Sequence, residues 1–593
     1  MTSTTNDDKN LTEVKRFFTH NPPRETAPRR PMSPTTRYLC GAAYGSAEFA
    51  DGVIAELVDD GHRAVVPAIG YDLGPVLRHC YHARHRWLVQ NALISAILVL
   101  GLFVATWPTV VLLLIAFAAM VMGPSTDRPS GPTWKLVLGA AAVAVVAWLF
   151  GRPLLALLFP GTAAGVEYGV QAEETESSAW SFLGWLLAFG LAVLCVIAMT
   201  RASVLRILTR DLAPGEQRQP PEISRAPVRR RMQVVTTAQH GNVVLHSGYD
   251  PFVGSGQVIH AWSLAMELKR DTSPDGSDPS GSGPVAVDPV ALNRHVKHRL
   301  AALSSADLPT HERLTGLALR DQIIASGARW RNYPLIDPRL RQPYSYASRE
   351  AVEAIIRAPQ PSVRHFLRAS VGAENREVTE AAGDTIMPAE YQNIVVSTFT
   401  HLAVEGGMLY VENVSTLLGP LKDEFLDIDQ YVAGDETGWE PVRQALTLFG
   451  ATTVLAPVRL AQAVGRALTA NRRMSQADRE AERLPRYDFG ARAEARQLAS
   501  ARRPVTYLQR LDAEKYSKLM ERRISEAVIG YLTDQGIDTS EYETRMNVFN
   551  NHGVFIRGDN HGPAAAGPGA TALLHDKSGR NKGKDGGDGA GRS

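Results

Sequence analysis

The chain has 593 residues, which at roughly 100–200 residues per domain predicts about three or four folding units. It carries 63 Lys and Arg against 61 Asp and Glu, a net charge of +2, and its apolar fraction is 45%. These averages exclude a wholly disordered chain, a collagen and a highly charged nucleic-acid tail. The cysteines Cys40, Cys80 and Cys195 are far apart in the chain, so we expect no disulfide framework and a reducing cytoplasm around the larger parts of the protein.

The first 86 residues divide into a leader and a small helical unit. Residues 1–36 are polar and then proline-rich, with no apolar stretch ahead of a small-residue cleavage site, so we expect a disordered leader and no signal peptide. In residues 37–86, apolar side chains follow a helical spacing, which predicts a small helical cytoplasmic unit. The apolar positions are Phe49, Val53, Ile54 and Leu57.

A second helix of this unit, capped by Asp72, carries three histidines and a cysteine. One interpretation is a zinc site, since His and Cys are zinc ligands. The other is a basic helix at the lipid headgroups, with its Arg and His side chains extending outward. Zinc sites usually pair clusters from different elements and no second cluster follows, so we expect the basic helix and no metal. The group is His79, Cys80, His82 and His85.

A membrane region is predicted over residues 87–200, because only 8 of the 113 residues from 88 to 200 are charged. As one helix, residues 88–123 would extend about 54 Å, against a hydrocarbon core of about 30 Å. We therefore expect a hairpin that turns at Thr106-Trp107-Pro108, with one long Pro-kinked helix as the alternative. The predicted spans are residues 88–105, 109–123, 134–151 and 180–200.

Flanking charges orient these spans. Residues 78–86 have a net charge of +3 and residues 201–231 of +5, whereas the loop 152–179 has −3. An excess of Lys and Arg marks the cytoplasmic side. Four spans place both basic flanks on that side, while three would place one of them outside. We therefore expect a multi-pass protein of the plasma membrane with both termini in the cytoplasm.

Two interactions of the membrane region follow. Residues 201–232 form a basic juxtamembrane linker, which we expect to contact anionic lipid headgroups at about 1 kcal/mol per basic residue. Nucleic-acid binding is the alternative and is not expected, because no aromatic residues are interleaved. Gly184 and Ala188 form a small-residue face that packs within the bundle or joins two copies, so a homo-oligomer is the second interaction considered.

Beyond the linker the apolar pattern changes to a period of two, which predicts strands. Residues 233–248 predict a hairpin around His240-Gly241-Asn242. Residues 391–418 predict a second hairpin around Glu405-Gly406-Gly407, apolar on both faces, as in a sheet covered by helices. With further strands at 258–268 and 362–373, these segments predict a cytoplasmic α+β domain over residues 233–431.

The loop 249–256 contains Gly254-Ser255-Gly256, which raises the question of a phosphate-binding loop. It lacks the third glycine of a dinucleotide fingerprint and the GK[ST] of a P-loop, so a structural turn is the favoured interpretation.

Residues 432–545 are predicted to be helical. Within them, residues 444–458 are uncharged, contain Pro457 and are too short to span a bilayer. The two interpretations are a buried helix and a helix at the membrane interface, and we favour the interfacial helix. The next helix is expected to break at Pro485. Residues 504–535 predict an amphipathic helix whose apolar stripe docks on the domain, formed by Leu508, Leu511, Tyr516 and Leu519.

The last segment, residues 546–593, is Gly- and Asn-rich. Val548, Phe549, Val554 and Ile556 alternate with polar residues, which predicts strands and turns followed by a disordered tail. Self-assembly of this segment as cross-β is an alternative.

Several stretches together resemble an uncharacterised set of actinobacterial multi-pass membrane proteins. They are RYLCGAAY, HRAVVPAIGYD, GYDPFVGSG, VVSTFTHLAVEGGMLYVE and FNNHGVFIRG. The resemblance extends over about residues 37–558. It implies a membrane location, and it implies no activity and no functional residues.

The expected fold class is thus an α-helical membrane bundle of about four transmembrane helices with a cytoplasmic α+β domain. The sequence contains no HExxH, GxSxG, P-loop, kinase or EF-hand motif, so no catalytic, cofactor or metal residues are predicted. The first functional hypothesis is a non-enzymatic, membrane-anchored sensor or scaffold whose cytoplasmic domain binds a ligand or a protein partner. A pore or transporter formed by oligomerisation and an enzyme with a site near the 249–256 loop are the alternatives.

Overall fold

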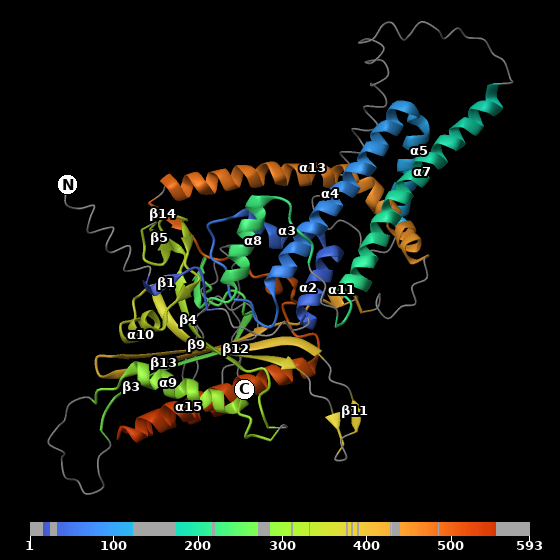
Figure 1. Ribbon diagram of the computed structural model, residues 1–593. Helices are drawn as coiled ribbons and strands as arrows, with labels where there is room; N and C mark the ends of the chain where they lie inside the picture. Colours follow the sequence, from blue (N-terminus) through green and yellow to red (C-terminus); the bar gives the residue numbers. More distant parts are fainter. Residues whose placement is uncertain are drawn as a thin grey trace, which may run out of the picture.

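The structure is a computed structural model in which a sheet domain and a projecting helical bundle are joined by continuous helices (Figure 1). The described residues are 16–23, 32–122, 174–215, 220–270, 285–309, 312–330, 332–374, 378–380, 384–387, 391–426, 428–429, 439–483 and 485–552.

A mixed sheet of six strands forms the centre of the domain, in the order β2-β4-β9-β12-β13-β3. β2 lies parallel to β4, and every other neighbouring pair is antiparallel. The predicted α+β class is confirmed. The strands are β2 (Val243–His246), β3 (Gln257–Glu267), β4 (Ala318–Ser326), β9 (Val363–Glu374), β12 (Tyr391–Glu405) and β13 (Met408–Leu418).

The β12–β13 hairpin forms where it was predicted. Its turn residues Gly406 and Gly407 have φ angles of 61° and 78°, a region that glycine enters without steric cost. Side chains alternate across the sheet: Val396 belongs to the core under the covering helices, and Phe399 belongs to an aromatic cluster on the opposite face. The sheet is therefore buried on both faces, as the apolar pattern predicted.

The first face of the sheet is covered by α9 (Pro289–Ala301), α15 (Tyr507–Asp534) and α16 (Ser540–His552) (Figure 1). A capping box of Thr506 and Gln509 starts α15. The helix was predicted correctly, and Tyr516 of its predicted stripe packs against the core, but the other three stripe residues do not. The stripe residues Leu508, Leu511 and Leu519 are exposed by 64%, 48% and 43%, because α15 packs on the sheet through a different face. That buried face contains Ala513, Met520, Ile524, Ala527, Val528 and Leu532.

The second face lies toward a helical layer built from both ends of the chain. Its helices are α2 (Pro34–Gly45), α3 (Ala47–Ile54), α8 (Ala226–Ala238), α14 (Ala495–Ala499) and the first turns of α4 (Leu73–Val104). One apolar cluster joins this layer. The four apolar positions predicted to form a helical face in residues 37–86 are all buried in it. That N-terminal segment therefore packs as one body with residues 226–238 and 495–499.

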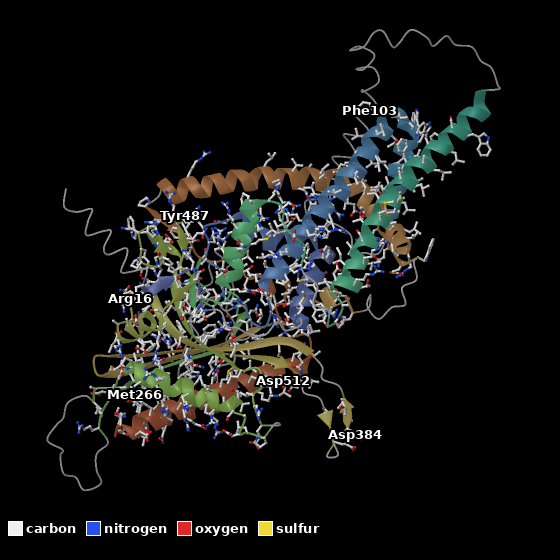
Figure 2. All side chains as sticks on the ribbon, viewed as in Figure 1. Arg16, Phe103, Met266, Asp384, Tyr487 and Asp512 are labelled. Carbon is white, nitrogen blue, oxygen red and sulfur yellow. The ribbon has the colours of Figure 1, made fainter. Side chains whose placement is uncertain are left out.

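The bundle consists of α4, α5 (Thr106–Met122) and α7 (Glu174–Arg206), and its outer surface is apolar. Phe103, labelled in Figure 2 at the far end of the bundle, is 76% exposed. Three described helices are long and apolar enough to cross a membrane, namely Leu73–Val104, Trp180–Asp211 and Glu440–Leu468. The apolar part of α5, Thr106–Val121, is shorter than these three helices.

The predicted hairpin turn is confirmed, and the alternative of one Pro-kinked helix is wrong. α4 ends at Val104, and α5 begins at Thr106 with Pro108 in its first turn, where a missing N–H costs no hydrogen bond. Thr109 packs so closely against Gly101 that a Cβ at position 101 would lie 2.5 Å from its hydroxyl oxygen. The glycine thus permits the close approach of the two helices.

α7 runs antiparallel to α4, from the far end of the bundle back to the domain (Figure 1). The Arg86 guanidinium donates to the Ser203 hydroxyl at the domain end. Gly184 and Ala188 are exposed on α7 among the described residues, so the packing predicted for this face is not formed by the described helices. The predicted span 134–151 lies outside the described residues, as do residues 152–173 of the acidic loop.

The predicted short helix at 444–458 is instead part of α13 (Glu440–Arg483), a 44-residue helix that continues through Pro457. A proline inside a helix removes one hydrogen bond and kinks the helix, but packing of the turns before it can offset that loss. Ala445 and Ala456 lie in one apolar cluster with residues of α4, α5 and α7. In Figure 1, α13 bends away from the bundle and crosses over the domain. The helix ends before Pro485, as predicted.

Three further predictions were wrong. Residues 233–238 belong to α8, and Val243–His246 pairs in parallel with β4, so no hairpin surrounds Gly241.

Residues 546–552 are the end of α16, because a helical register set at Ser540 overrides the alternating pattern. In the leader, Phe18–Thr19 forms strand β1 and pairs with Tyr346–Ala347 (β8). Residues 553–593, and with them cross-β assembly, lie outside the described part.

Candidate functional site

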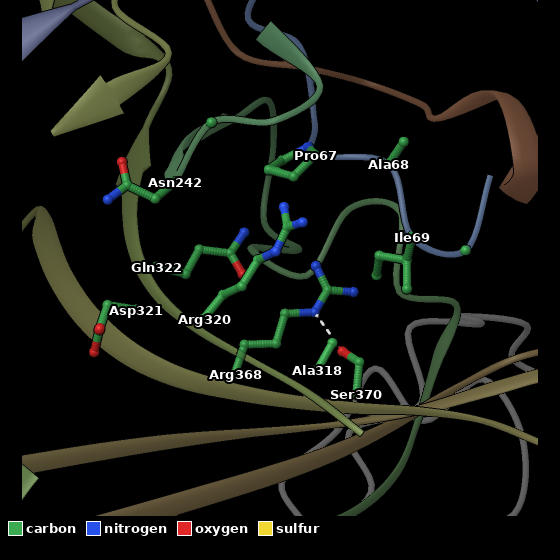
Figure 3. Close-up of a pocket in the computed structure, with 12 residues that line it drawn as sticks. Pro67, Ala68, Ile69, Asn242, Ala318, Arg320, Asp321, Gln322, Arg368 and Ser370 are labelled. Carbon is green, nitrogen blue, oxygen red and sulfur yellow. Dashed lines mark hydrogen bonds between the residues drawn. The ribbon is translucent and has the colours of Figure 1, made fainter. Parts of the chain in front are cut away.

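A small cavity lies between the second face of the sheet and two loops that close over it (Figure 3). Its volume is about 80 Å³, several times the ~10–15 Å³ that one water molecule needs. Strands β4 and β9 form its floor, and the segments 67–70 and 241–242 form its walls. We call it the arginine cavity, because Arg320 of β4 and Arg368 of β9 both point into it.

Arg368 is held in place by neutral partners only. Its side chain is buried; Nε donates to Ser370 Oγ at 3.1 Å, and Nη2 donates to Ser255 Oγ at 2.9 Å and to Ser397 Oγ at 3.3 Å. The guanidinium carbon lies 4.9 Å from the ring centre of Phe399, within cation–π range. These contacts orient the guanidinium group without neutralising it. Its Nη1 has no acceptor among the described residues.

Arg320 stands directly opposite Arg368 in the antiparallel β4–β9 pair. Figure 3 shows their guanidinium groups side by side at the cavity. Like charges that face each other across two strands destabilise a sheet. Burial, and then the positive charge of Arg320, lower the pKa of Arg368 to about 9, against the opposing effect of the Glu494 carboxyl group. In the described part of the chain, Arg320 has neither a hydrogen-bond partner nor an ion-pair partner.

Two acidic side chains near the cavity are engaged elsewhere. In Figure 3, Asp321 turns away from the guanidinium groups, and its carboxylate accepts from His365 Nε2 at 3.0 Å and from Lys297 Nζ at 2.5 Å. Against the effect of burial, these two bonds lower the pKa of Asp321. Burial raises the pKa of Glu494, whose carboxyl group accepts the Tyr71 hydroxyl. The cavity therefore keeps an excess of positive charge.

The cavity floor also holds an oxygen atom that lacks a donor. Gln322 lies two residues after Arg320 on the same side of β4 and is 5% exposed. No donor reaches its Oε1 in the part of the chain that the structure describes. An unsatisfied buried acceptor costs about 1–3 kcal/mol. The arrangement thus presents positively charged donors beside one buried acceptor.

The cavity walls are tied to the start of α4 through Gln239. The side-chain oxygen of Gln239 accepts from the Leu73 amide at 2.7 Å, and its nitrogen donates to Asp72, the N-cap of α4, at 2.9 Å. Its backbone oxygen accepts from the amide of Ala68, a wall residue, at 3.2 Å. Asn242, three residues after Gln239, belongs to the other wall. Gln239 therefore bonds both to a cavity wall and to the first turn of α4.

The 249–256 loop lies beside the cavity and forms a tight turn. Gly254 and Gly256 both have φ of 82°, and a Cβ at Gly256 would lie 2.0 Å from the backbone oxygen of Leu417. The Ser255 amide donates to the Phe252 carbonyl at 3.0 Å. The turn contributes one group to the site, the Ser255 hydroxyl that accepts from Arg368. Its glycines thus serve the backbone conformation, as the structural interpretation predicted.

The histidine group of α4 is part of the domain core. The Tyr44 hydroxyl of α2 lies 3.0 Å from His79 Nδ1 and 3.1 Å from His82 Nδ1. His79 and Cys80 are buried, so the prediction of an outward-facing helix at the headgroups is wrong for these two residues. The described residues contain no group of three or more potential metal ligands. Burial, followed by the neighbouring His82, lowers the pKa of His79 to about 4.

The basic linker is partly structural. Arg231 donates to the backbone oxygens of Leu57, Asp60 and Arg63. Burial lowers its pKa to about 10. The prediction that the whole of 201–231 contacts lipid is therefore wrong for Arg231, whereas Arg230 is exposed.

Residues 261–562 match the AbeC-like domain, just over half of the chain. The chain belongs to the AbeC-like domain family. Neither the curated proteins nor the solved structures contain a match. The match includes the cavity floor, with Arg320, Gln322 and Arg368, and the bundle-packing part of α13. The walls at 67–70 and 241–242 lie outside it, so the arginine cavity is completed by chain segments that precede the family domain.

The sequence patterns did not predict the cavity residues. Arg320 and Arg368 occur in strand patterns at positions where apolar residues would face inward, and that conflict was the one available signal. Their proximity follows from the β4–β9 register, which depends on chain segments far apart in the sequence.

Proposed function

We propose that this protein is a multi-pass membrane protein with four spans and cytoplasmic termini, and that it works as a non-enzymatic sensor. The cytoplasmic domain receives a ligand, and the bundle receives the resulting conformational change. Anionic headgroups at the exposed basic residues of 201–230, a second copy of the chain and a cytoplasmic protein are the proposed partners.

One observation carries this proposal. α4 is a single helix whose first turns, with Leu73, Val76 and Leu77, are buried in the domain core and whose later residues, from 94 to 104, belong to the apolar bundle. Gln239 links its N-cap to the cavity walls. A rigid helix transmits a displacement of one end to the other with little loss. The domain and the bundle are therefore suited to respond together.

The direction of the helices supports four spans. α4 leaves the domain, α5 returns toward it, and α7 starts at the far end again (Figure 1). We propose that the chain between Met122 and Glu174 crosses the membrane once more before it enters α7. The apolar segment 134–151 supplies the fourth span in our proposal. Exposed apolar side chains on α4 and α7, among them Leu100 and Leu191, suit contact with lipid.

α13 is proposed to lie at the membrane interface. Phe425 before it and Ala495 after it belong to the same apolar cluster, so both ends of α13 return to one side of the membrane. A single crossing would separate them. The first half of α13 contacts the bundle, and Arg443 and Arg459 flank its uncharged segment 444–458. Basic residues at both ends of an apolar segment suit the lipid headgroup layer.

Cysteine labelling of intact cells tests the topology. In a chain without native cysteines, Ser177→Cys is expected to react with a membrane-impermeant maleimide from outside. Ala306→Cys, which is exposed on the domain, is the matched control and is expected to react only after lysis. Protection of Ser177→Cys, or labelling of Ala306→Cys in intact cells, contradicts the four-span arrangement.

A further inference from the structure

We propose that the arginine cavity binds a phosphate group, either as free inorganic phosphate or as the end of a small phosphate ester. The phosphate group would be the ligand of the sensor proposed above, and this role rests on that proposed function. The binding itself requires no particular membrane topology. Two guanidinium groups that converge on one cavity, with a buried amide beside them, carry the argument.

The charge of the cavity is the first step. Arg320 and Arg368 face each other across β4 and β9, and Ser255, Ser370 and Ser397 are neutral. The protein thus keeps two positive charges together where their repulsion and desolvation both cost free energy. An anion between them would reverse both costs. Guanidinium groups bind oxyanions by paired N–H donors, and Nη1 of Arg368 has such donors free of acceptors among the described residues.

The acceptor on the floor selects among oxyanions. Gln322 Oε1 lacks a donor in the described residues, so an occupant that brings an O–H satisfies this acceptor. A hydrogen phosphate ion, or a singly protonated phosphate ester, carries anionic oxygens for the arginines and one O–H for Gln322. Sulfate is fully ionised near neutral pH and has no O–H. The residues therefore favour phosphate over sulfate.

The size of the cavity limits the occupant. A volume of about 80 Å³ accommodates a small tetrahedral anion, and the walls at Ala68 and Asn242 confine anything attached to it. Arg496 keeps one wall in position by donating to the carbonyls of Ile69 at 3.2 Å and Asn393 at 2.8 Å. The occupant would thus contact the same wall segment that bonds to Gln239 and α4.

Calorimetric titration of the full chain in lipid nanodiscs tests the proposal. The probes are inorganic phosphate, sulfate and glycerol 3-phosphate. Arg320→Gln is the main variant, because Arg320 bonds to no described residue and its loss leaves no partner unsatisfied. It is expected to weaken phosphate binding at least about tenfold, the scale of one charge-assisted hydrogen bond. Arg299→Gln removes the same charge from an exposed position on α9 and is expected to bind as the wild type does.

A second variant tests the choice of anion. Gln322→Leu is expected to keep anion binding and to lose the preference for phosphate over sulfate. Binding of glycerol 3-phosphate alone supports the ester as the source, and binding of both phosphate probes supports free phosphate. The proposal is overturned if the wild type binds neither phosphate probe, if sulfate binds equally well, or if Arg320→Gln binds phosphate unchanged. Each of these outcomes is independent of the labelling of Ser177→Cys.

Discussion

The buried charged groups on the two faces of the sheet differ in their contacts. On the face covered by α9, α15 and α16, the Glu521 carboxylate of α15 is 8% exposed. It accepts from Ser415 at 2.7 Å, Ser517 at 2.8 Å and His260 Nδ1 at 3.0 Å. On the opposite face, the buried Arg368 is bonded to serines and opposed by Arg320. A buried charge whose contacts include an opposite charge has a structural role, whereas a buried guanidinium group that contacts only hydroxyl groups is suited to bind a further anion.

The strongest test of this comparison removes the satisfied charge. Glu521→Leu leaves Ser415, Ser517 and His260 without their acceptor, and we expect it to lower the free energy of unfolding by about 3 kcal/mol. Urea unfolding of the full chain in detergent, followed by circular dichroism, measures this loss. Glu526→Leu on the exposed side of the same helix is the control, with an expected loss below about 1 kcal/mol.

Asp321 is the second satisfied charge and gives a smaller effect. Asp321→Asn keeps one acceptor oxygen but removes the charge that His365 and Lys297 face, so we expect a loss of about 2 kcal/mol in the same assay. Asp307→Asn, at an exposed position, is the control. Equal stability of the two variants contradicts a structural role for the Asp321 carboxylate.

Arg368 is expected to behave in the opposite way in the absence of anion. Arg368→Met removes three bonds to hydroxyl groups but also removes the repulsion from Arg320, so the free energy of unfolding should change by less than about 1 kcal/mol. Urea unfolding in phosphate-free buffer measures it. A loss as large as that of Glu521→Leu would mean that Arg368 is a structural ion.

The smallest effect is a pH dependence at His260. The hydrogen bond with Glu521 raises the pKa of His260 despite burial. A raised folded-state pKa adds stability that is complete below the ordinary pKa of 6.5 and is lost as the pH rises through the folded-state value. Unfolding curves between pH 6 and pH 9 should therefore show a decline in stability that Glu521→Gln weakens. An identical decline in that variant assigns the pH dependence to another group.

The sequence predicted what depends on local pattern. The β12–β13 hairpin, the turn at Thr106-Trp107-Pro108 and the helix within residues 504–535 follow from periodicity and turn residues that lie close together. These predictions were confirmed because each element is long or has a strong breaker at its end.

The remaining features depend on contacts between distant segments. Val234-Val235-Thr236-Thr237 favours a strand by its β-branched residues, yet it forms part of α8 because Val235 packs into the core shared with α4. α13 passes through Pro457 because the turns before the proline, with Ala445 and Ala456, are packed into the bundle. The arginine cavity was not predictable, since β4 and β9 have to pair before its two arginines meet.

The central claim is that an anion in the arginine cavity is sensed at the start of α4. Hydrogen exchange of the full chain in nanodiscs, with and without inorganic phosphate, tests it most directly. We predict slower exchange of the amides at 68–73 and 239–243 in the wild type with phosphate, and no change in Arg320→Gln. Phosphate binding that leaves the exchange of residues 68–73 unaltered would contradict the link between the cavity and the bundle.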